Sequence, residues 1–319
     1  MDSGLVTILV PVVLALIMFG LGMSLGIGDF RRVREYPRVV LAALGCQLVV
    51  LPAACFGLIH AFGLAAAPAI GMMLLAASPG GTMANLYSHL FGGDVALNIT
   101  LTAINSVLAV FTLPLVVNLA VGYWDTAGED GTVGLQFGKT LQVFALVLIP
   151  VAVGMVVRAR RPGFAERAER PVKALCLVIL AGVIVAAFLA ERNNVGEYLA
   201  EVGLIALVFS CISLGTGYLA ARLVGAAHTQ GVAACMEIGM HNTSLSLTIA
   251  MSPSLLDSTE IAVPSAVYAI LIYFTAGAAG LLLRRFGAGQ RTGEGRSRPG
   301  AVEQGAGHED GQAAGRGGA

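Results

Sequence analysis

The segment Cys235–Ser244 holds the residues best suited to chemistry in this chain, because it places polar groups within otherwise apolar sequence. It contains the carboxylate of Glu237, the imidazole of His241, the amide of Asn242 and two hydroxyls. A charge in the middle of a membrane span costs at least ~2.5 kcal/mol, so such acids usually face a protein interior or a watery cavity, paired or bound to an ion. We therefore predict that Glu237 belongs to a functional site; the alternative is a structural polar contact between helices.

A second apolar run is interrupted in the same way, between Ser78 and Asn85. Pro79 lacks a backbone donor and disfavours helix at Ser78, and the two glycines that follow tolerate unwound backbone. Paired interruptions of this kind are the best sequence indication of a transporter binding site, since the freed backbone groups need partners that a bound ion and water can supply. Alone, this motif is explained equally well by a kinked structural helix.

The side chains around the two interruptions favour a hard monovalent cation. They offer carboxylate, amide and hydroxyl oxygens, the donors that alkali ions share with the harder divalent ions. One carboxylate among neutral oxygens is sparse for Ca²⁺, and no Cys/His cluster suggests zinc or copper. No Walker motif and no nucleophile with an oriented base are present, so we expect neither an ATPase nor an enzyme, and no cofactor other than Na⁺ as a coupling ion. The oxygen donors are Gln47, Asn85, Asn98, Thr102, Glu237, Asn242 and Thr243.

Composition indicates the elements that must position these groups. The chain has 319 residues, is 56% hydrophobic and only 12% charged, and has a mean hydropathy of +0.81, whereas soluble domains are about one quarter charged. The zero net charge gives no basic field for nucleic acid. We predict an all-α polytopic membrane protein with about nine spans of ~20 residues. They are Leu5–Ile27, Val39–Ala61, Leu64–Leu90, Val95–Val121, Leu141–Val157, Val172–Ala190, Val202–Val224, the segment around Glu237, and Ile261–Leu283.

Arginines predict the orientation. They gather in alternate loops, including residues 31–38, 158–170 and 284–285, while the intervening loops are mostly acidic. The positive-inside rule then places the N-terminus outside and the C-terminus inside the plasma (cytoplasmic) membrane. Residues 1–286 are expected to form the transmembrane domain. Residues 287–319 are rich in Gly, Arg, Glu and Gln, and we expect a disordered cytoplasmic tail there.

Four stretches together resemble the bile acid:sodium symporter family. They are Met18–Met23 with Asp29–Val33, Pro79–Thr82 with Asn85, Gly93–Leu97, and Glu237–Met240 with Asn242. The order and spacing of these stretches cover the chain from about Phe19 to Arg285. The resemblance implies a panel and a core domain, inverted repeats with two broken crossing helices, and Na⁺-coupled uptake of an organic anion by alternating access. The chain is similar to the nine-span, bacterial-type variant.

The resemblance also implies two sodium sites. The first would use Asn85, Thr102 and Glu237, with Asn98 at a position where the family often has serine. The second would use Gln47, Glu237 and His241 with the backbone of Ile238 and Met240. His241 stands where a glutamine is usual, so two interpretations are open: an imidazolium that replaces the ion's charge, or a neutral hydrogen-bonding substitute for the amide.

Substrate binding is expected at the N-terminal ends of the broken helices, whose dipoles favour a carboxylate or sulfonate. The expected residues are Pro79, Gly80, Thr82, Asn242 and Thr243. Alternatives are a proton-coupled carrier that uses Glu237 and His241 as a relay, a passive channel, and a membrane sensor. The residues do not choose among organic anions, between one and two coupled ions, or among oligomeric states.

Overall fold

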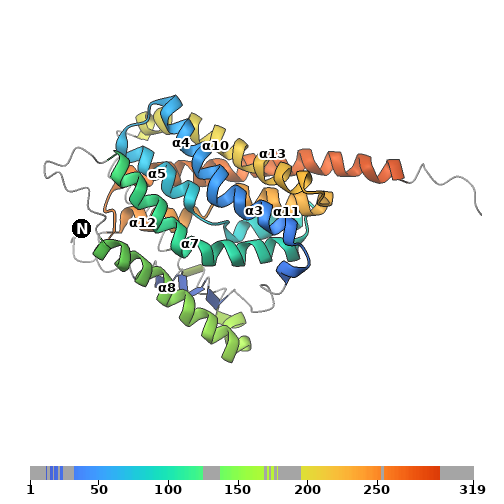
Figure 1. Ribbon diagram of the computed structural model, residues 1–319, viewed down its shortest axis with the longest axis horizontal. Coiled ribbons are helices and arrows are strands. Elements are labelled where there is room, and N and C mark those ends of the chain that lie inside the picture. The colour runs from blue at the N-terminus through green and yellow to red at the C-terminus, as the bar shows by residue number, and fades with distance from the viewer. Residues whose placement is uncertain are drawn as a thin grey trace, which may run out of the picture.

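The computed structural model describes residues 32–124, 137–168, 195–252 and 255–294, with scattered positions between 12 and 23 and between 171 and 178. These residues form helices, and the one β pairing among them is an isolated bridge between Gly80 and His241. The helical elements, most of them labelled in Figure 1, are η1 (Arg32–Arg34), α3 (Pro37–Gly45), η2 (Cys46–Val50), α4 (Leu51–Phe62), α5 (Ala66–Ala77), α6 (Thr82–Leu90), α7 (Val95–Trp124), α8 (Phe137–Arg160), α10 (Val195–Leu223), α11 (His228–Gly239), α12 (Thr243–Met251) and α13 (Thr259–Glu294).

The all-α prediction is confirmed for the described part of the chain, and seven of the predicted spans coincide with these helices. Four helical stretches there are long and apolar enough to cross a membrane: Pro37–Phe62, Val95–Trp124, Val202–Leu223 and Thr259–Phe286. The predicted first and sixth spans lie largely outside the described residues, so the count of nine stays a prediction. The predicted boundary at residue 286 falls inside α13, and residues 295–319 also lie outside the described part.

The stretch Pro37–Phe62 is one apolar rod that contains a π-helical turn, η2, between α3 and α4. In that turn the Leu51 N–H bonds the Cys46 carbonyl, five residues earlier. Pro52 accounts for this irregularity, because its ring has no N–H and clashes with the carbonyl of residue 48 in a regular helix. The turn carries Gln47, whose side chain is 3% exposed, so it sets the direction in which this amide enters the core.

Two other helical stretches are fully interrupted by non-helical residues. The first breaks where α5 ends at Ala77 and α6 begins at Thr82, with Ser78 and Gly81 in extended backbone conformations. The second breaks where α11 ends at Gly239 and α12 begins at Thr243. Both breaks fall where proline, glycine or polar residues interrupt the apolar sequence, as predicted.

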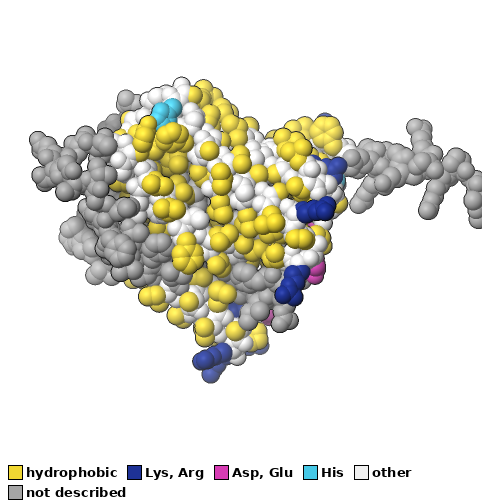
Figure 2. Space-filling model, viewed as in Figure 1, with side chains coloured by type: hydrophobic (Ala, Val, Ile, Leu, Met, Phe, Trp, Pro, Cys, Tyr) yellow, Lys and Arg dark blue, Asp and Glu magenta, His cyan; other side chains and the backbone are white. Residues whose placement is uncertain are grey.

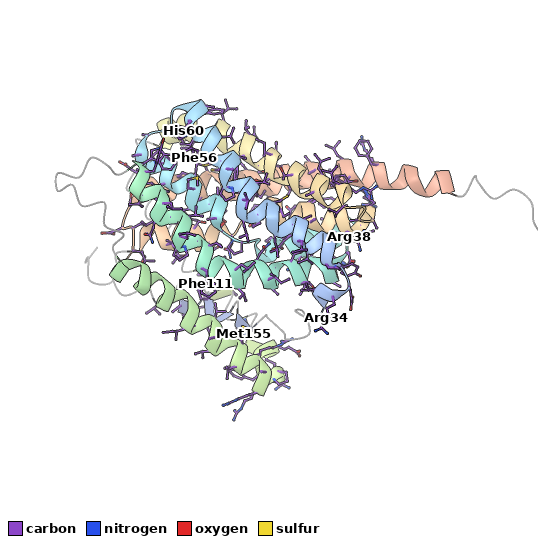
Figure 3. The ribbon with its side chains drawn as sticks, viewed as in Figure 1. Arg34, Arg38, Phe56, His60, Phe111 and Met155 are labelled. Atoms are coloured by element: carbon purple, nitrogen blue, oxygen red, sulfur yellow. The ribbon has the colours of Figure 1, made fainter. Side chains whose placement is uncertain are left out.

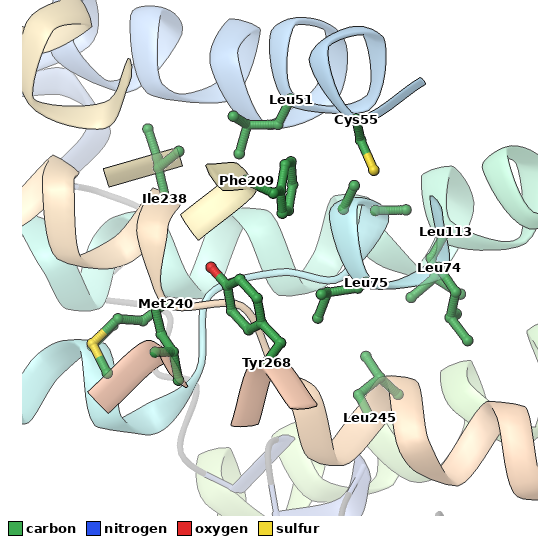
Figure 4. Close-up of a cluster of buried hydrophobic side chains, with 14 of the residues drawn as sticks. Leu51, Cys55, Leu74, Leu75, Leu113, Phe209, Ile238, Met240, Leu245 and Tyr268 are labelled. Carbon is green, nitrogen blue, oxygen red and sulfur yellow. The ribbon is translucent and has the colours of Figure 1, made fainter. Parts of the chain in front are cut away.

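Large apolar side chains close the space around the breaks (Figure 4). Leu51, Phe209 and Tyr268 are all fully buried and come from α4, α10 and α13. The Tyr268 hydroxyl donates to the Gly239 carbonyl at 2.7 Å, so α13 supports the end of α11 directly. The helices on this side therefore form one packed body, while α8 lies along the far side of α7 (Figure 1).

Basic side chains gather at one end of the helices. Figure 2 shows Lys and Arg at one end of an otherwise largely apolar face, and Figure 3 places Arg34 and Arg38 at that end, opposite Phe56 and His60. Phe56, His60, Tyr123 and Trp124 pack together, with all six ring-to-ring distances between 4.3 and 5.9 Å. Tyr and Trp are enriched where spans meet the membrane surface, and Arg in the loops beside spans, so both clusters fit a multi-pass membrane protein.

Candidate cation site

The two helix breaks pair with each other through the backbone. The Gly81 N–H donates to the Met240 carbonyl and the Asn242 N–H donates to the Pro79 carbonyl, each at 2.8 Å. These bonds form the antiparallel bridge between Gly80 and His241. Segments about 160 residues apart in sequence thus meet, and each satisfies backbone groups that the other break had freed.

Glu237 lies in the last turn of α11 at this meeting point, and its side chain is fully buried. Its Oε2 accepts a hydrogen bond from the Thr102 hydroxyl at 2.5 Å, and its Oε1 accepts one from the Asn105 amide at 3.3 Å. The Thr102 hydroxyl also lies 3.0 Å from the Asn98 carbonyl. Because the hydroxyl has a single proton, it donates to the carboxylate, which is the closer and the stronger acceptor. Helix α7 therefore holds both oxygens of the carboxylate.

Gly80 completes the enclosure of the carboxylate. A Cβ at this position would overlap the Oε1 and Cδ atoms of Glu237 and crowd its backbone carbonyl. Only a residue without a side chain lets the backbone of the first break approach the acid of the second so closely. The sequence pattern had suggested glycine here for unwinding, whereas the structure shows that it is also needed for the contact with Glu237.

Among the residues that the structure describes, four buried amide oxygens have no hydrogen-bond partner. They belong to Gln47, Asn85, Asn98 and Asn105. The Nδ2 of Asn98 donates to the Ala233 carbonyl at 2.8 Å, and the Nε2 of Gln47 donates to the carbonyls of Ala76 and Ser78 at 3.3 and 3.0 Å. An unsatisfied buried acceptor costs about 1–3 kcal/mol. Those on α6 and α7 lie on helices that pack against the helix of Glu237, and such oxygens are the donors that a hard cation prefers.

His241 is 4% exposed and lies against Ser78 in the first break and against α10 and α13. Its Nδ1 is 3.2 Å from the Ser78 carbonyl, its Nε2 is 3.4 Å from the Ser213 hydroxyl, and its ring stacks on Phe209. Because a carbonyl only accepts, Nδ1 carries a proton, and a neutral ring can accept from Ser213 at Nε2. Among the residues that the structure describes, His241 makes no ion pair with Glu237, and this pattern suits the neutral substitute better than the imidazolium.

The other predicted residues have the following places. Ile238 and Met240 are buried beside Glu237, and the Met240 carbonyl accepts from Gly81. The side chain of Asn242 caps α12 by accepting from the Leu245 N–H at 3.1 Å. Thr243 and Thr82 begin α12 and α6, although the Thr82 side chain lies outside the described part. No hydrogen bond in that part joins Gln47, Asn85 or Asn98 to Glu237.

Sequence reasoning missed Asn105 as a partner of Glu237, and Ser213 as a partner of His241. Asn105 follows Thr102 by three residues and Asn98 by seven, which places all three on one face of a helix. That spacing would have identified Asn105. Nothing comparable in the sequence indicates Ser213, because it contacts His241 from α10, a different part of the fold.

Comparison with known proteins identifies the family. The model of the Sodium Bile acid symporter family matches residues 11–198 of this chain. The chain belongs to this family. It is similar to the uncharacterized sodium-dependent transporter YocS of Bacillus subtilis (strain 168), with 31% identity over 267 residues that cover 82% of this chain and 78% of that protein.

More distant relatives include animal proteins. The ileal sodium/bile acid cotransporter of Oryctolagus cuniculus is 25% identical over 250 residues, which cover 77% of this chain and 70% of the cotransporter. The P3 protein of Homo sapiens is 29% identical over 218 residues, which cover 67% of this chain and 44% of that protein. Family membership, with the apolar helices above, makes this chain a multi-pass membrane transporter and not an enzyme.

Proposed function

We propose that this protein is a sodium-coupled symporter that imports an organic anion. The observation that carries the proposal is the buried Glu237 carboxylate at the paired helix breaks, on a helix packed against α6 and α7, which hold buried amide oxygens without partners in the described part of the chain. A cation there would neutralise the acid and satisfy oxygens that are otherwise costly to bury. The names of two relatives, a sodium-dependent transporter and a sodium/bile acid cotransporter, support Na⁺ as that cation.

The proposed ligands are those that the family resemblance implies. Glu237 supplies the charge, Thr102 orients Oε2, and Asn85 and Asn98 offer oxygens that have no other partner. Gln47 would contribute to a second position with the backbone of Ile238 and Met240. We propose that the packed body around these residues acts as a core domain, that a panel domain including α8 moves against it, and that the movement provides alternating access from an outside-facing N-terminus to an inside C-terminus.

The proposed substrate site lies at the start of α6 and α12. Both helices begin at the paired breaks, so two positive dipole ends come together there, an arrangement that favours a carboxylate or sulfonate. Pro79, Gly80, Thr82, Asn242 and Thr243 lie at these ends. The expected substrates are organic anions such as bile acids or small keto and hydroxy acids.

Uptake into proteoliposomes tests the function. Radiolabelled organic anions are added under an inward Na⁺ gradient, with K⁺ at matched ionic strength as the control. We expect saturable uptake of at least one anion with Na⁺ alone. Uptake driven by a proton gradient without Na⁺ would favour the proton-coupled carrier. Unsaturable flux that is indifferent to Na⁺ would indicate a channel, and binding without flux a sensor.

The accumulation ratio reports how many ions are coupled. With a tenfold Na⁺ gradient worth ~1.4 kcal/mol per ion and 100 mV worth ~2.3 kcal/mol per net charge, two ions carrying a monoanion supply ~5 kcal/mol, which is roughly a thousandfold accumulation or more. One ion with a monoanion is electroneutral and gives only about tenfold. Measuring steady-state accumulation at a clamped potential therefore distinguishes the two stoichiometries.

Replacing His241 by glutamine is expected to change either the Hill slope for Na⁺ or the pH dependence of uptake. The imidazole bonds the same Ser78 carbonyl that accepts from Gln47, so a change at one partner alters the position of the other. A glutamine also restores an oxygen that imidazole lacks. The measurement is Na⁺-dependent uptake from pH 6 to 8, and identical curves for the two proteins would refute a role for His241 in coupling.

A further inference from the structure

Asn105 on α7 is a buried polar residue that contacts Glu237 directly. Neither the sequence motifs nor the proposed ligand set includes it. Its side chain is 1% exposed. Its Nδ2 lies 3.3 Å from Oε1 of Glu237, and its Oδ1 has no hydrogen-bond partner among the described residues. The N–H side of the amide thus donates to the carboxylate, whereas its carbonyl oxygen is an unsatisfied buried acceptor, which is unfavourable.

We infer that Asn105 is a further residue of the cation site, which holds Oε1 of Glu237 and supplies Oδ1 as an additional oxygen ligand. The inference rests on the proposed function, since it assumes that Glu237 binds a cation. An amide is suited to this double role because its N–H and C=O groups point in different directions. Thr102, one turn earlier on α7, holds the other carboxylate oxygen, so the two residues fix the acid from both sides.

A purely structural polar contact usually leaves both halves of a buried amide hydrogen-bonded within the protein. The structure shows instead that only Nδ2 is satisfied. Its neighbour Ser106 provides the matched control. Ser106 is also on α7 and is 3% exposed, and in the described part of the chain its Oγ has no hydrogen-bond partner, Glu237 included.

The test compares thermal melting of wild type, Asn105→Leu and Ser106→Ala during NaCl titration, with KCl at matched ionic strength as reference. Leucine has the branched shape of asparagine, although it is somewhat larger, and it removes both polar atoms. We expect the half-saturating Na⁺ concentration to rise about tenfold or more in Asn105→Leu, the loss associated with one hydrogen bond to a charged group. Ser106→Ala should stay within about twofold of wild type, and substrate affinity at saturating Na⁺ should change little in either variant.

A second variant is expected to gain a response to Ca²⁺ rather than to lose the response to Na⁺. Asn105→Asp places a second carboxylate beside Glu237, and two acids favour a hard divalent ion. At pH 8 we expect millimolar CaCl₂ to raise the melting temperature of this variant but not that of wild type. An unchanged Na⁺ response in Asn105→Leu, or no Ca²⁺ response in Asn105→Asp, would overturn the inference. If wild type itself shows no Na⁺ response, the proposed function fails instead.

Discussion

Replacing Glu237 by glutamine is expected to abolish Na⁺-driven uptake and Na⁺-selective stabilisation together. The side chain is fully buried and no second acid contacts it among the described residues, so the variant leaves a bound cation without a counter-charge. Removing one partner of a buried charge pair costs about 3–5 kcal/mol, which lowers Na⁺ affinity by roughly a hundredfold or more. Uptake assays and Na⁺ titrations of the melting temperature measure this loss.

The same variant should fold, because glutamine has nearly the same size and its oxygen can still accept from Thr102. Its melting temperature in KCl is expected to equal or exceed that of wild type, since an amide costs less to bury than a charge. Glu260→Gln is the control, because Glu260 lies in the exposed first turn of α13. Wild-type Na⁺ dependence in Glu237→Gln would exclude Glu237 from the cation site.

Gly80→Ala is expected to have the second large effect. The new methyl group would overlap the Glu237 carboxylate and crowd its backbone carbonyl, so either the acid or the backbone bridge must move. Overpacking of this kind costs about 1–3 kcal/mol of folding stability, and displacement of the acid should reduce Na⁺ affinity and uptake by tenfold or more. Melting temperature and Na⁺-dependent uptake report the two effects separately.

The adjacent Gly81→Ala is the matched control. A Cβ there approaches nothing closer than 3.5 Å, the distance to the Met240 carbonyl oxygen, which is ordinary contact. Uptake within about threefold of wild type is expected, because the cost of an accommodated methyl is small. If the two glycine variants behave alike, the close approach of Gly80 to Glu237 has no functional importance.

The helix breaks and the buried acid could be predicted from sequence because they depend on local signals. Proline, two glycines and a polar run interrupt apolar stretches at Ser78–Gly81 and Glu237–Asn242, and the structure breaks its helices at both places. That the two breaks meet was implied by the family resemblance rather than by the residues themselves. The backbone bonds between Gly81 and Met240 and between Pro79 and Asn242 now describe that meeting.

The contacts that complete the site could not be predicted in the same way. The partners of His241 are Ser78 in the first break and Ser213 and Phe209 on α10, and single-sequence patterns contain no information on which distant segments touch. The π-helical turn that contains Gln47 arises from Pro52, several residues later, and the sequence pattern around Gln47 alone does not indicate it. Asn105 differs, because its helical spacing from Thr102 was visible in the sequence and only its significance was missed.

Melting of the detergent-purified wild-type protein in NaCl and in KCl, at matched ionic strength and pH 8, tests the central claim most directly. Binding to the folded state alone stabilises it by RT ln(1 + [Na⁺]/Kd), which is about 1.4 kcal/mol at a concentration ten times Kd and raises the melting temperature by a few degrees. The account predicts a saturable stabilisation by Na⁺ that K⁺ does not reproduce and that Glu237→Gln removes. Equal melting temperatures in the two salts at all concentrations would contradict a sodium site at Glu237.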